Sequence, residues 1–224
     1  MRWALLALIG GIAYLSAVTL DLPLLRMLCK PLPVLALLLW ILSTPADAYR
    51  RWVAIGMALS ILGDILLEWP INAFVPGLAA FLLAHLAYLV AYLGDTRRLA
   101  PAGLLFAALL GGGLFALLSS RGLGPLLLPI ALYSLTISCM LWRATARLGV
   151  PSIGSASRIF AAFGALLFVS SDAMIGISRF VAAFDGSSYA IMLTYWLGQL
   201  GIAASVTSRH LPLPYSSGQP TTRA

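Results

Sequence analysis

Two aspartates, Asp64 in SILGDILLEW and Asp172 in LFVSSDAMIG, interrupt apolar stretches of the chain. A charged side chain at membrane depth costs at least about 2.5–3.5 kcal/mol, so such residues usually face a bundle interior and serve a function. Of two carboxyl groups in an apolar setting, one can stay protonated and act as an acid while the other acts as a base. The same pair would suit a proton relay, and a purely structural hydrogen bond between helices is the alternative for each residue.

Further polar residues lie within the apolar segments at helical spacing, in steps of three or four. FLLAHLAYLVAY carries a phenylalanine, a histidine and two tyrosines on one face, YWLGQ carries a tyrosine and a glutamine one turn apart, and Asp64 has a polar residue one turn to either side. The residues selected in this way are Ser60, Glu68, Phe81, His85, Tyr88, Tyr92, Tyr195 and Gln199. Together they predict a polar pocket, although each alone is equally well explained as an interfacial or helix-joining residue.

The residue inventory excludes several chemistries. His85 is the only histidine inside an apolar segment, so a three-histidine zinc site is not available, and Cys29 and Cys139 have neither metal-ligand nor disulfide spacing. A GxSxG nucleophile elbow, a GxGD protease motif, a phosphate-binding loop and an intramembrane lysine are all absent from the sequence. We therefore expect neither a metal nor another cofactor.

The elements that must position these residues are membrane helices. Of the 224 residues, 61% are hydrophobic and only 9% are charged, against roughly a quarter charged in soluble domains. Segments of about 20 apolar residues predict spans near 3–20, 32–44, 52–68, 73–93, 99–119, 123–142, 159–179 and 187–207. We expect an all-α integral membrane protein with one eight-helix domain over residues 1–210 and a disordered cytoplasmic tail over residues 211–224. The first segment is interpreted as a retained helix, with a cleaved signal peptide as the alternative.

Basic residues divide unequally between the two sides of this bundle. On the side of the termini lie ten: Arg2, Arg50, Arg51, Arg97, Arg98, Arg143, Arg147, Arg158, Arg209 and Arg223. On the other side lie four: Arg26, Lys30, Arg121 and Arg179. The positive-inside rule then places both termini in the cytoplasm of a cell-membrane protein, in the inner membrane if the cell is bacterial. Because topology explains the net charge of +7, we expect no nucleic-acid partner.

The acidic residues outside the apolar segments are interpreted as solvated loop charges: Asp21, Asp47, Asp95 and Asp185. The two intramembrane aspartates differ from these. The third and seventh spans run in the same direction, and Asp64 and Asp172 lie at comparable depth in them. We expect the two side chains to meet in one pocket among the third, fourth, seventh and eighth spans.

SILGDILLEW, FLLAHLAYLVAY, FGALLFVSSDAMIG and YWLGQLGIA, in this order, resemble the lysoplasmalogenase-like (YhhN) family of multi-pass membrane proteins. The resemblance runs from about the third span to the eighth, and its strongest part is GALLFVSSD. It implies hydrolysis of the vinyl ether bond of a lysoplasmalogen to a fatty aldehyde and glycerophosphoethanolamine or glycerophosphocholine. The implied partners are a lysophospholipid substrate and the surrounding membrane lipids.

The resemblance, combined with residue types, gives a hypothesis for the reaction. One of Asp64 and Asp172 would protonate the alkenyl carbon, and the other would stabilise the cation and activate water, as paired carboxylates do in glycoside hydrolysis. The sequence does not decide which does which. The proposed substrate contacts are His85, Tyr88, Tyr195 and Gln199 for the water and the ether oxygen, Ser60 and Ser171 as supporting donors, and Glu68 and Arg179 for the head-group amine and phosphate.

Two other functions remain open from the sequence. A proton-coupled transporter or channel for a small or lipid-like solute could use the same carboxylates, although the interrupted spans typical of transporters are not evident in the sequence. A non-catalytic interaction protein, in which the aspartates only join helices, is the third alternative. The sequence does not predict an oligomeric state.

Overall fold

The computed structural model describes residues 2–71 and 73–210, and this part of the chain is helical without any strand. The α-helices are α1 (Arg2–Thr19), α2 (Pro23–Cys29), α3 (Leu32–Leu42), α4 (Ala48–Leu67), α5 (Phe74–Asp95), α6 (Pro101–Ser119), α7 (Leu127–Ala146), α8 (Ser155–Phe180) and α9 (Ser187–Thr207). Three short 3-10 helices accompany them: η1 (Gly124–Leu126), η2 (Arg147–Gly149) and η3 (Ser208–His210). The predicted all-α fold is confirmed, whereas the predicted tail, residues 211–224, lies outside the described residues.

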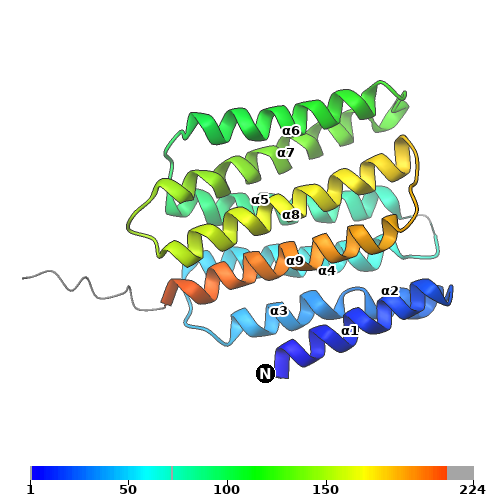
Figure 1. Ribbon diagram of the computed structural model, residues 1–224, viewed down its shortest axis with the longest axis horizontal. Helices are drawn as coiled ribbons and strands as arrows, with labels where there is room; N and C mark the ends of the chain where they lie inside the picture. The colour runs from blue at the N-terminus through cyan, green and yellow to red at the C-terminus, as the bar shows by residue number, and fades with distance from the viewer. Residues whose placement is uncertain (1, 72, 211–224) are drawn as a thin grey trace, which may run out of the picture.

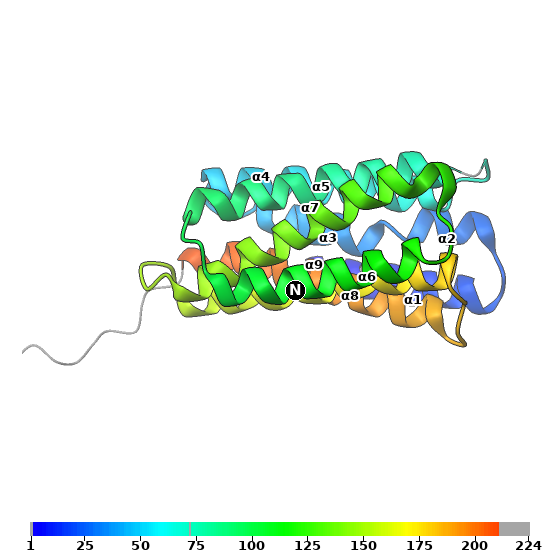
Figure 2. The ribbon, with the colours of Figure 1, turned by 90° about the horizontal axis from the view of Figure 1, so that it is seen from above.

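Four helices form the centre of the bundle. Figures 1 and 2 show α4 beside α5 and α8 beside α9, with the first pair facing the second. The α6–α7 pair covers one edge of this centre, and α1, α2 and α3 cover the other. The third, fourth, seventh and eighth predicted spans correspond to α4, α5, α8 and α9, so the helices expected to hold the polar residues do lie together.

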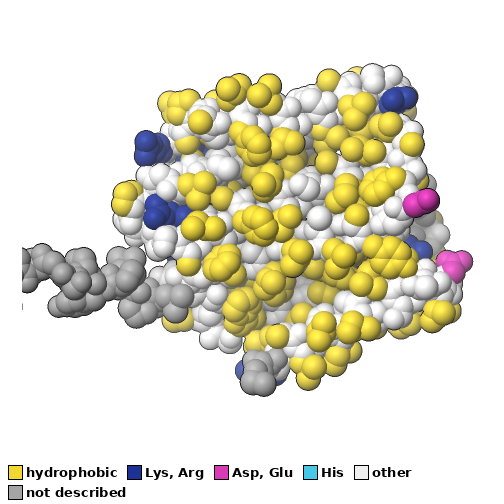
Figure 3. Space-filling model, viewed as in Figure 1, with side chains coloured by type: hydrophobic (Ala, Val, Ile, Leu, Met, Phe, Trp, Pro, Cys, Tyr) yellow, Lys and Arg dark blue, Asp and Glu magenta, His cyan; other side chains and the backbone are white. Residues whose placement is uncertain are grey.

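The surface and length of the helices fit a bilayer. Among the described residues, seven helical segments are long and apolar enough to cross a membrane, with α2 and α3 counted as one. The remaining segment, α4, packs within the bundle but carries Arg50, Arg51 and Asp64 along its length. Apolar side chains cover the middle of the face in Figure 3, and the charged side chains visible there lie toward its two ends. The chain is a multi-pass membrane protein.

The second span begins earlier than predicted. The predicted residues 32–44 correspond to α3, but a further helix, α2, precedes it and is separated from it by Lys30 and Pro31. Lys30 keeps helical geometry, with φ −53° and ψ −46°, but Pro31 has no amide hydrogen to donate, so the hydrogen-bond ladder of α2 is not continued through it. The charges of Arg26 and Lys30 indicated a loop in the sequence, yet Arg26 lies within α2 and Lys30 caps it.

Glycines bring α8 and α9 into backbone contact. A Cβ atom on Gly164 would lie 2.7 Å from the carbonyl oxygen of Gly198 and 2.7 Å from the amide nitrogen of Ile202. On α4, a Cβ atom on Gly56 would overlap the ring of Tyr88 from α5. The absent side chains at Gly164 and Gly56 therefore allow the central helices to approach closely enough for polar groups on different helices to touch.

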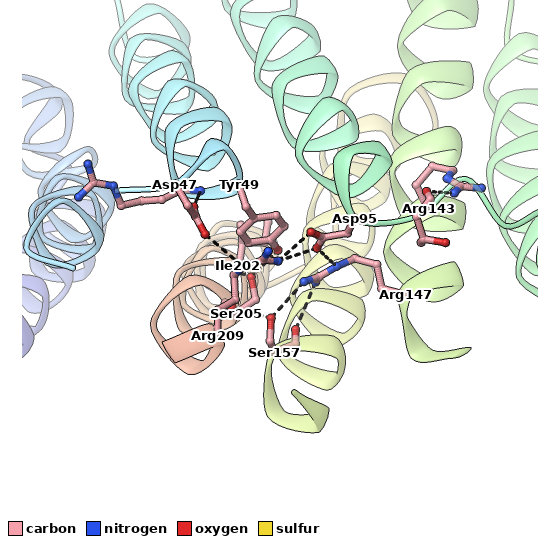
Figure 4. Close-up of polar contacts among 11 residues, drawn as sticks. Asp47, Tyr49, Asp95, Arg143, Arg147, Ser157, Ile202, Ser205 and Arg209 are labelled. Carbon is pink, nitrogen blue, oxygen red and sulfur yellow. Dashed lines mark hydrogen bonds and ion pairs between the residues drawn. The ribbon is translucent and has the colours of Figure 1, made fainter. Parts of the chain in front are cut away.

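A polar cluster joins five elements at the end of the bundle where α4 begins and α9 ends (Figure 4). Arg147, which is fully buried, donates from Nε to Asp95 Oδ2 at 2.8 Å and from Nη2 to Ser157 Oγ at 3.0 Å. Arg209 donates from Nη1 to both Asp95 oxygens at 2.8 Å, and its Nε lies 3.3 Å from Asp47 Oδ2. The interpretation of Asp47 and Asp95 as solvated charges is therefore wrong: both are paired, and the Asp95 side chain is only 8% exposed.

Candidate functional site

Asp64 lies at the end of a buried chain of hydrogen bonds between three helices. The hydroxyl of Tyr195 on α9 donates to Asp64 Oδ2 at 2.8 Å, and Gln199 Nε2 donates to the Tyr195 hydroxyl at 3.5 Å. Tyr88 on α5 donates to Gln199 Oε1 at 2.9 Å, and its hydroxyl lies 3.5 Å from Ser60 Oγ, one turn before Asp64. All five side chains are buried. The structure thus brings together half of the ten residues that the sequence proposed as catalytic or as substrate contacts.

Asp172 has a separate set of partners. The hydroxyl of Tyr133 on α7 donates to Asp172 Oδ2 at 2.6 Å, and Nε2 of His85 on α5 lies 3.5 Å from the same oxygen. Neither ring nitrogen of His85 forms a hydrogen bond within the described part of the chain. Tyr133 was not selected from the sequence, although a tyrosine beside Ser134 in the apolar segment IALYSLTIS was an available signal.

One aromatic ring lies against both sets of partners. The Phe168 ring contacts the His85 ring edge-on at 4.7 Å between centroids and the Tyr195 ring at 5.3 Å. Phe81 contacts Phe168 and Tyr195 at 6.1 and 5.9 Å. Phe168 therefore separates the partners of Asp64 from those of Asp172. The two carboxylates were expected to meet in one pocket, but each has its own tyrosine, and of the two only Asp172 lines the apolar cavity described next.

A narrow apolar cavity of about 70 Å³ adjoins Asp172. Its polar lining groups are Asp172, Tyr133 and Ser134, and its remaining walls come from apolar residues of α4 to α8, including Phe81 and Val169. One water needs roughly 10–15 Å³ on this measure, so the cavity has room for a few water-sized groups. An apolar cavity with a few convergent polar groups is typical of a small-molecule site. Asp64, in contrast, is 1% exposed, does not line this cavity and is hydrogen-bonded to Tyr195.

A polar cavity of about 310 Å³, the vestibule, opens at the end of the bundle away from the termini. Its charged lining residues are Arg26, Lys30, Glu68 and Arg179. Three further lining residues, Leu67, Phe74 and Ile175, also line the apolar cavity, so the two spaces adjoin.

Glu68 binds two of the cationic side chains of the vestibule. Its Oε1 accepts from Lys30 Nζ at 3.1 Å and from the Tyr14 hydroxyl at 3.2 Å, and its Oε2 lies 3.1 Å from Arg26 Nη2. Burial alone would raise the pKa of the Glu68 carboxyl, but Lys30 and Arg26 outweigh it and hold that pKa below its ordinary value. The sequence missed these pairs because Arg26 and Lys30 were interpreted as loop charges.

The two remaining selected residues lie apart from the aspartates. The hydroxyl of Ser171 donates to the carbonyl oxygen of Ile191 at 2.9 Å, so it joins α8 to α9 and does not point to Asp172. The guanidinium of Arg179 lies 3.7 Å above the ring of Phe74, at the vestibule. Within residues 2–71 and 73–210, no three His, Cys, Asp or Glu side chains are placed to hold a metal ion together.

Comparison with known proteins identifies the family. The model of the YhhN family matches residues 25–206, which is most of the chain. The chain belongs to the YhhN family. Both aspartates, their tyrosine partners and all four charged residues of the vestibule lie within the matched region.

Relatives of this YhhN protein include human and bacterial enzymes. Human "Lysoplasmalogenase TMEM86B" is 37% identical over 185 residues, covering 82% of this chain and 75% of the relative. "Lysoplasmalogenase" of Mycobacterium tuberculosis is 33% identical over 168 residues, covering 71% and 62% respectively. Human "Lysoplasmalogenase TMEM86A" is 31% identical over 197 residues, covering 84% and 80%. No solved structure matches this YhhN chain.

Proposed function

We propose that this protein is a lysoplasmalogenase, a membrane-embedded hydrolase that cleaves the vinyl ether bond of lysoplasmalogens. The products are a fatty aldehyde and glycerophosphoethanolamine or glycerophosphocholine. The names of its relatives support this activity. The observation that carries the proposal is the position of Asp172, a carboxyl group hydrogen-bonded to Tyr133 in the wall of an otherwise apolar cavity. Such a group can deliver a proton to an apolar, electron-rich double bond.

Protonation of the alkenyl chain starts the reaction. Asp172 gives its proton to the second carbon of the alkenyl chain, which leaves an oxocarbenium ion shared between the first carbon and the ether oxygen. The resulting Asp172 carboxylate stabilises this cation, and the hydroxyl of Tyr133 holds the carboxylate in place. Asp172 takes the acid role in preference to Asp64 because Asp172 lines the cavity, whereas Asp64 does not line it and is hydrogen-bonded to Tyr195.

Addition of water completes the reaction. Water bonds to the first carbon and loses a proton, giving a hemiacetal. The bond from that carbon to the glycerol oxygen then breaks. The oxygen takes up the proton that the water lost and leaves as an alcohol, while the hemiacetal hydroxyl gives its proton back to the Asp172 carboxylate and its carbon becomes the aldehyde. Asp64 is the second carboxylate and accepts the proton of the water through the Tyr195 hydroxyl, which Gln199 and Tyr88 orient. His85, whose Nε2 lies 3.5 Å from Asp172 Oδ2, is placed to orient the water or the ether oxygen beside that carboxyl group.

Substitution of each aspartate tests the proposal. Purified protein is given a lysoplasmalogen, and aldehyde release is measured for the wild type, Asp172→Asn, Asp64→Asn and the control Asp185→Asn in the exposed α8–α9 connection. We expect about a 10²–10⁴-fold loss of kcat for Asp172→Asn and a clear loss for Asp64→Asn, with the control unchanged. Thermal melting in detergent checks that each variant is folded. Full activity in both aspartate variants would exclude the mechanism.

The transporter hypothesis gains one observation from the structure. The spanning segment made of α2 and α3 is interrupted at Lys30 and Pro31, and interrupted helices are common at the binding sites of transporters. Solute flux in proteoliposomes, without hydrolysis of any vinyl ether, would favour that alternative.

The proposal also includes an orientation. The end of the bundle where α4 begins and α9 ends carries most of the basic residues, so we place it and both termini in the cytoplasm. The vestibule then opens on the opposite side of the membrane. Labelling of single cysteines in the α3–α4 and α8–α9 connections by an impermeant reagent tests this orientation, and reversed labelling would refute it.

A further inference from the structure

The vestibule holds more positive than negative charge. Among the described residues its lining contains three cations, Arg26, Lys30 and Arg179, and one carboxylate, Glu68. Arg26 and Lys30 share that carboxylate, while Arg179 forms no ion pair within the described part of the chain and lies on the ring of Phe74. Because Arg179 is exposed and carries an unshared charge, it is available to bind an anion at the mouth of the apolar cavity.

Two buried polar groups of the vestibule also lack hydrogen-bond partners among the described residues. Arg26 Nε and Ser178 Oγ are buried and find no hydrogen-bond partner among the described residues. Both residues line the vestibule. Unpaired buried donors are costly, and an anion with several acceptor oxygens would satisfy them together with the cations.

The spacing of Arg179 and Asp172 on α8 places the charge of the vestibule near the proposed catalytic acid. Arg179 follows Asp172 by seven residues, which is two helical turns and about 10 Å along the axis on the same face. The vestibule and the apolar cavity share Leu67, Phe74 and Ile175. A molecule with an anionic head can therefore place that head in the vestibule and the first few atoms of the adjoining linker and chain in the apolar cavity.

From these contacts we propose that Arg26, Lys30 and Arg179 form a subsite for the phosphodiester of the lysophospholipid, with Glu68 as the internal counter-ion that positions Arg26 and Lys30. This inference rests on the proposed function and changes one part of the hypothesis drawn from the sequence. Glu68 does not hold the head-group amine, because both of its oxygens are already engaged by Tyr14, Lys30 and Arg26. The phosphate is the recognised group.

Kinetics with and without a phosphate on the substrate test the subsite. The substrates are 1-alkenyl-glycerophosphoethanolamine and 1-alkenylglycerol with the same chain. The variants are Arg179→Gln, Lys30→Gln and, as the matched control, Arg121→Gln in the exposed α6–α7 connection. For Arg179→Gln we expect KM for the phospholipid to rise about tenfold or more with kcat nearly unchanged, and the kinetics with 1-alkenylglycerol to stay at the wild-type values. An unchanged KM, or an equal loss with both substrates, would overturn the subsite.

Binding of an inert analogue separates this inference from the proposed function. A 1-O-alkyl lysophospholipid has a saturated ether and no vinyl bond, so it reports binding even in a protein that cleaves nothing. We expect it to raise the melting temperature of the wild type more than 1-O-alkylglycerol does, and Arg179→Gln to remove that difference. Equal stabilisation of wild type and variant would refute the subsite, whereas absence of aldehyde release with normal binding would refute only the proposed activity.

Inorganic phosphate distinguishes a lipid subsite from a site for a free anion. If the head group is the ligand, millimolar phosphate alone should give a much smaller, Arg179-dependent shift than the lipid analogue. A shift from phosphate as large as that from the lipid analogue would overturn the assignment to a lipid head group.

Discussion

The hydroxyl of Tyr195 on α9 donates a hydrogen bond to the carboxylate of Asp64 on α4 across 2.8 Å. Tyr133 on α7 makes the equivalent bond to Asp172 on α8 at 2.6 Å. The two carboxylates are thus held in the same way but in different surroundings, since Asp172 lines a cavity and Asp64 is enclosed. This asymmetry is the physical reason for giving the two aspartates different roles in the proposed reaction.

Removal of the Tyr195 hydroxyl should impair turnover without unfolding the protein. A hydrogen bond to a charged group contributes about 1.5–3 kcal/mol, so Tyr195→Phe should lower kcat by roughly 10–100-fold if Asp64 acts as the second carboxylate. The control is Tyr189→Phe near the start of α9, whose hydroxyl is hydrogen-bonded to the exposed Thr19. Aldehyde release measured at saturating lysoplasmalogen checks both variants, and wild-type kcat in Tyr195→Phe would contradict the role of Asp64.

The sequence predicted the parts of the fold that depend on local patterns. Apolar length gave eight spans close to the observed helices, and steps of three and four placed Phe81, His85, Tyr88 and Tyr92 on one face, which is confirmed by their burial. These features follow from helix geometry and the thickness of a bilayer, so they can be predicted from each segment by itself.

The sequence did not predict the contacts between distant segments. Lys30 with Glu68, Arg147 with Asp95, and Tyr133 with Asp172 each join residues on different helices. A charge near the end of a span has the same sequence pattern whether it is solvated or paired, because its partner is fixed only by how the helices pack. Helical periodicity therefore identified candidate residues but not the partners that hold them.

Close packing of α8 on α9 gives a prediction for stability. In Gly164→Ala the new Cβ atom would lie 2.7 Å from backbone atoms of α9, which must move apart, so we expect destabilisation by about 1–3 kcal/mol. The matched control is Gly112→Ala on α6, where nothing lies within 4 Å of the new atom and higher helix propensity should leave stability equal or greater. Thermal melting in one detergent compares the two. Equal melting temperatures would show that α8 and α9 can move apart at the Gly164 contact with little loss of stability.

The cluster at the end where α9 ends should contribute mainly to folding. Arg147→Gln removes one of the two cationic partners of Asp95 and leaves only Arg209. Loss of one partner from a buried ion pair typically costs about 3–5 kcal/mol. The exposed Arg97→Gln serves as the control and should have little effect. The double variant Asp95→Asn, Arg147→Gln should recover part of the loss, because no buried charge then lacks its partner. Additive losses in the double variant, measured by melting, would mean that the two residues act independently.

Glu68 should make stability depend on acidity at low pH. Its folded-state pKa is below the ordinary value of 4.5 because Lys30 and Arg26 outweigh the effect of burial, so folding favours the ionised form. The resulting stabilisation is complete above the unfolded-state pKa, near 4.5, and is lost as the pH falls below that value through the folded-state pKa. The wild type should therefore melt at a higher temperature than Glu68→Gln at pH 7, and the difference should shrink below about pH 4.5. A difference that stays constant from pH 7 to pH 3 would indicate that Glu68 stabilises the bundle by packing and not by its charge.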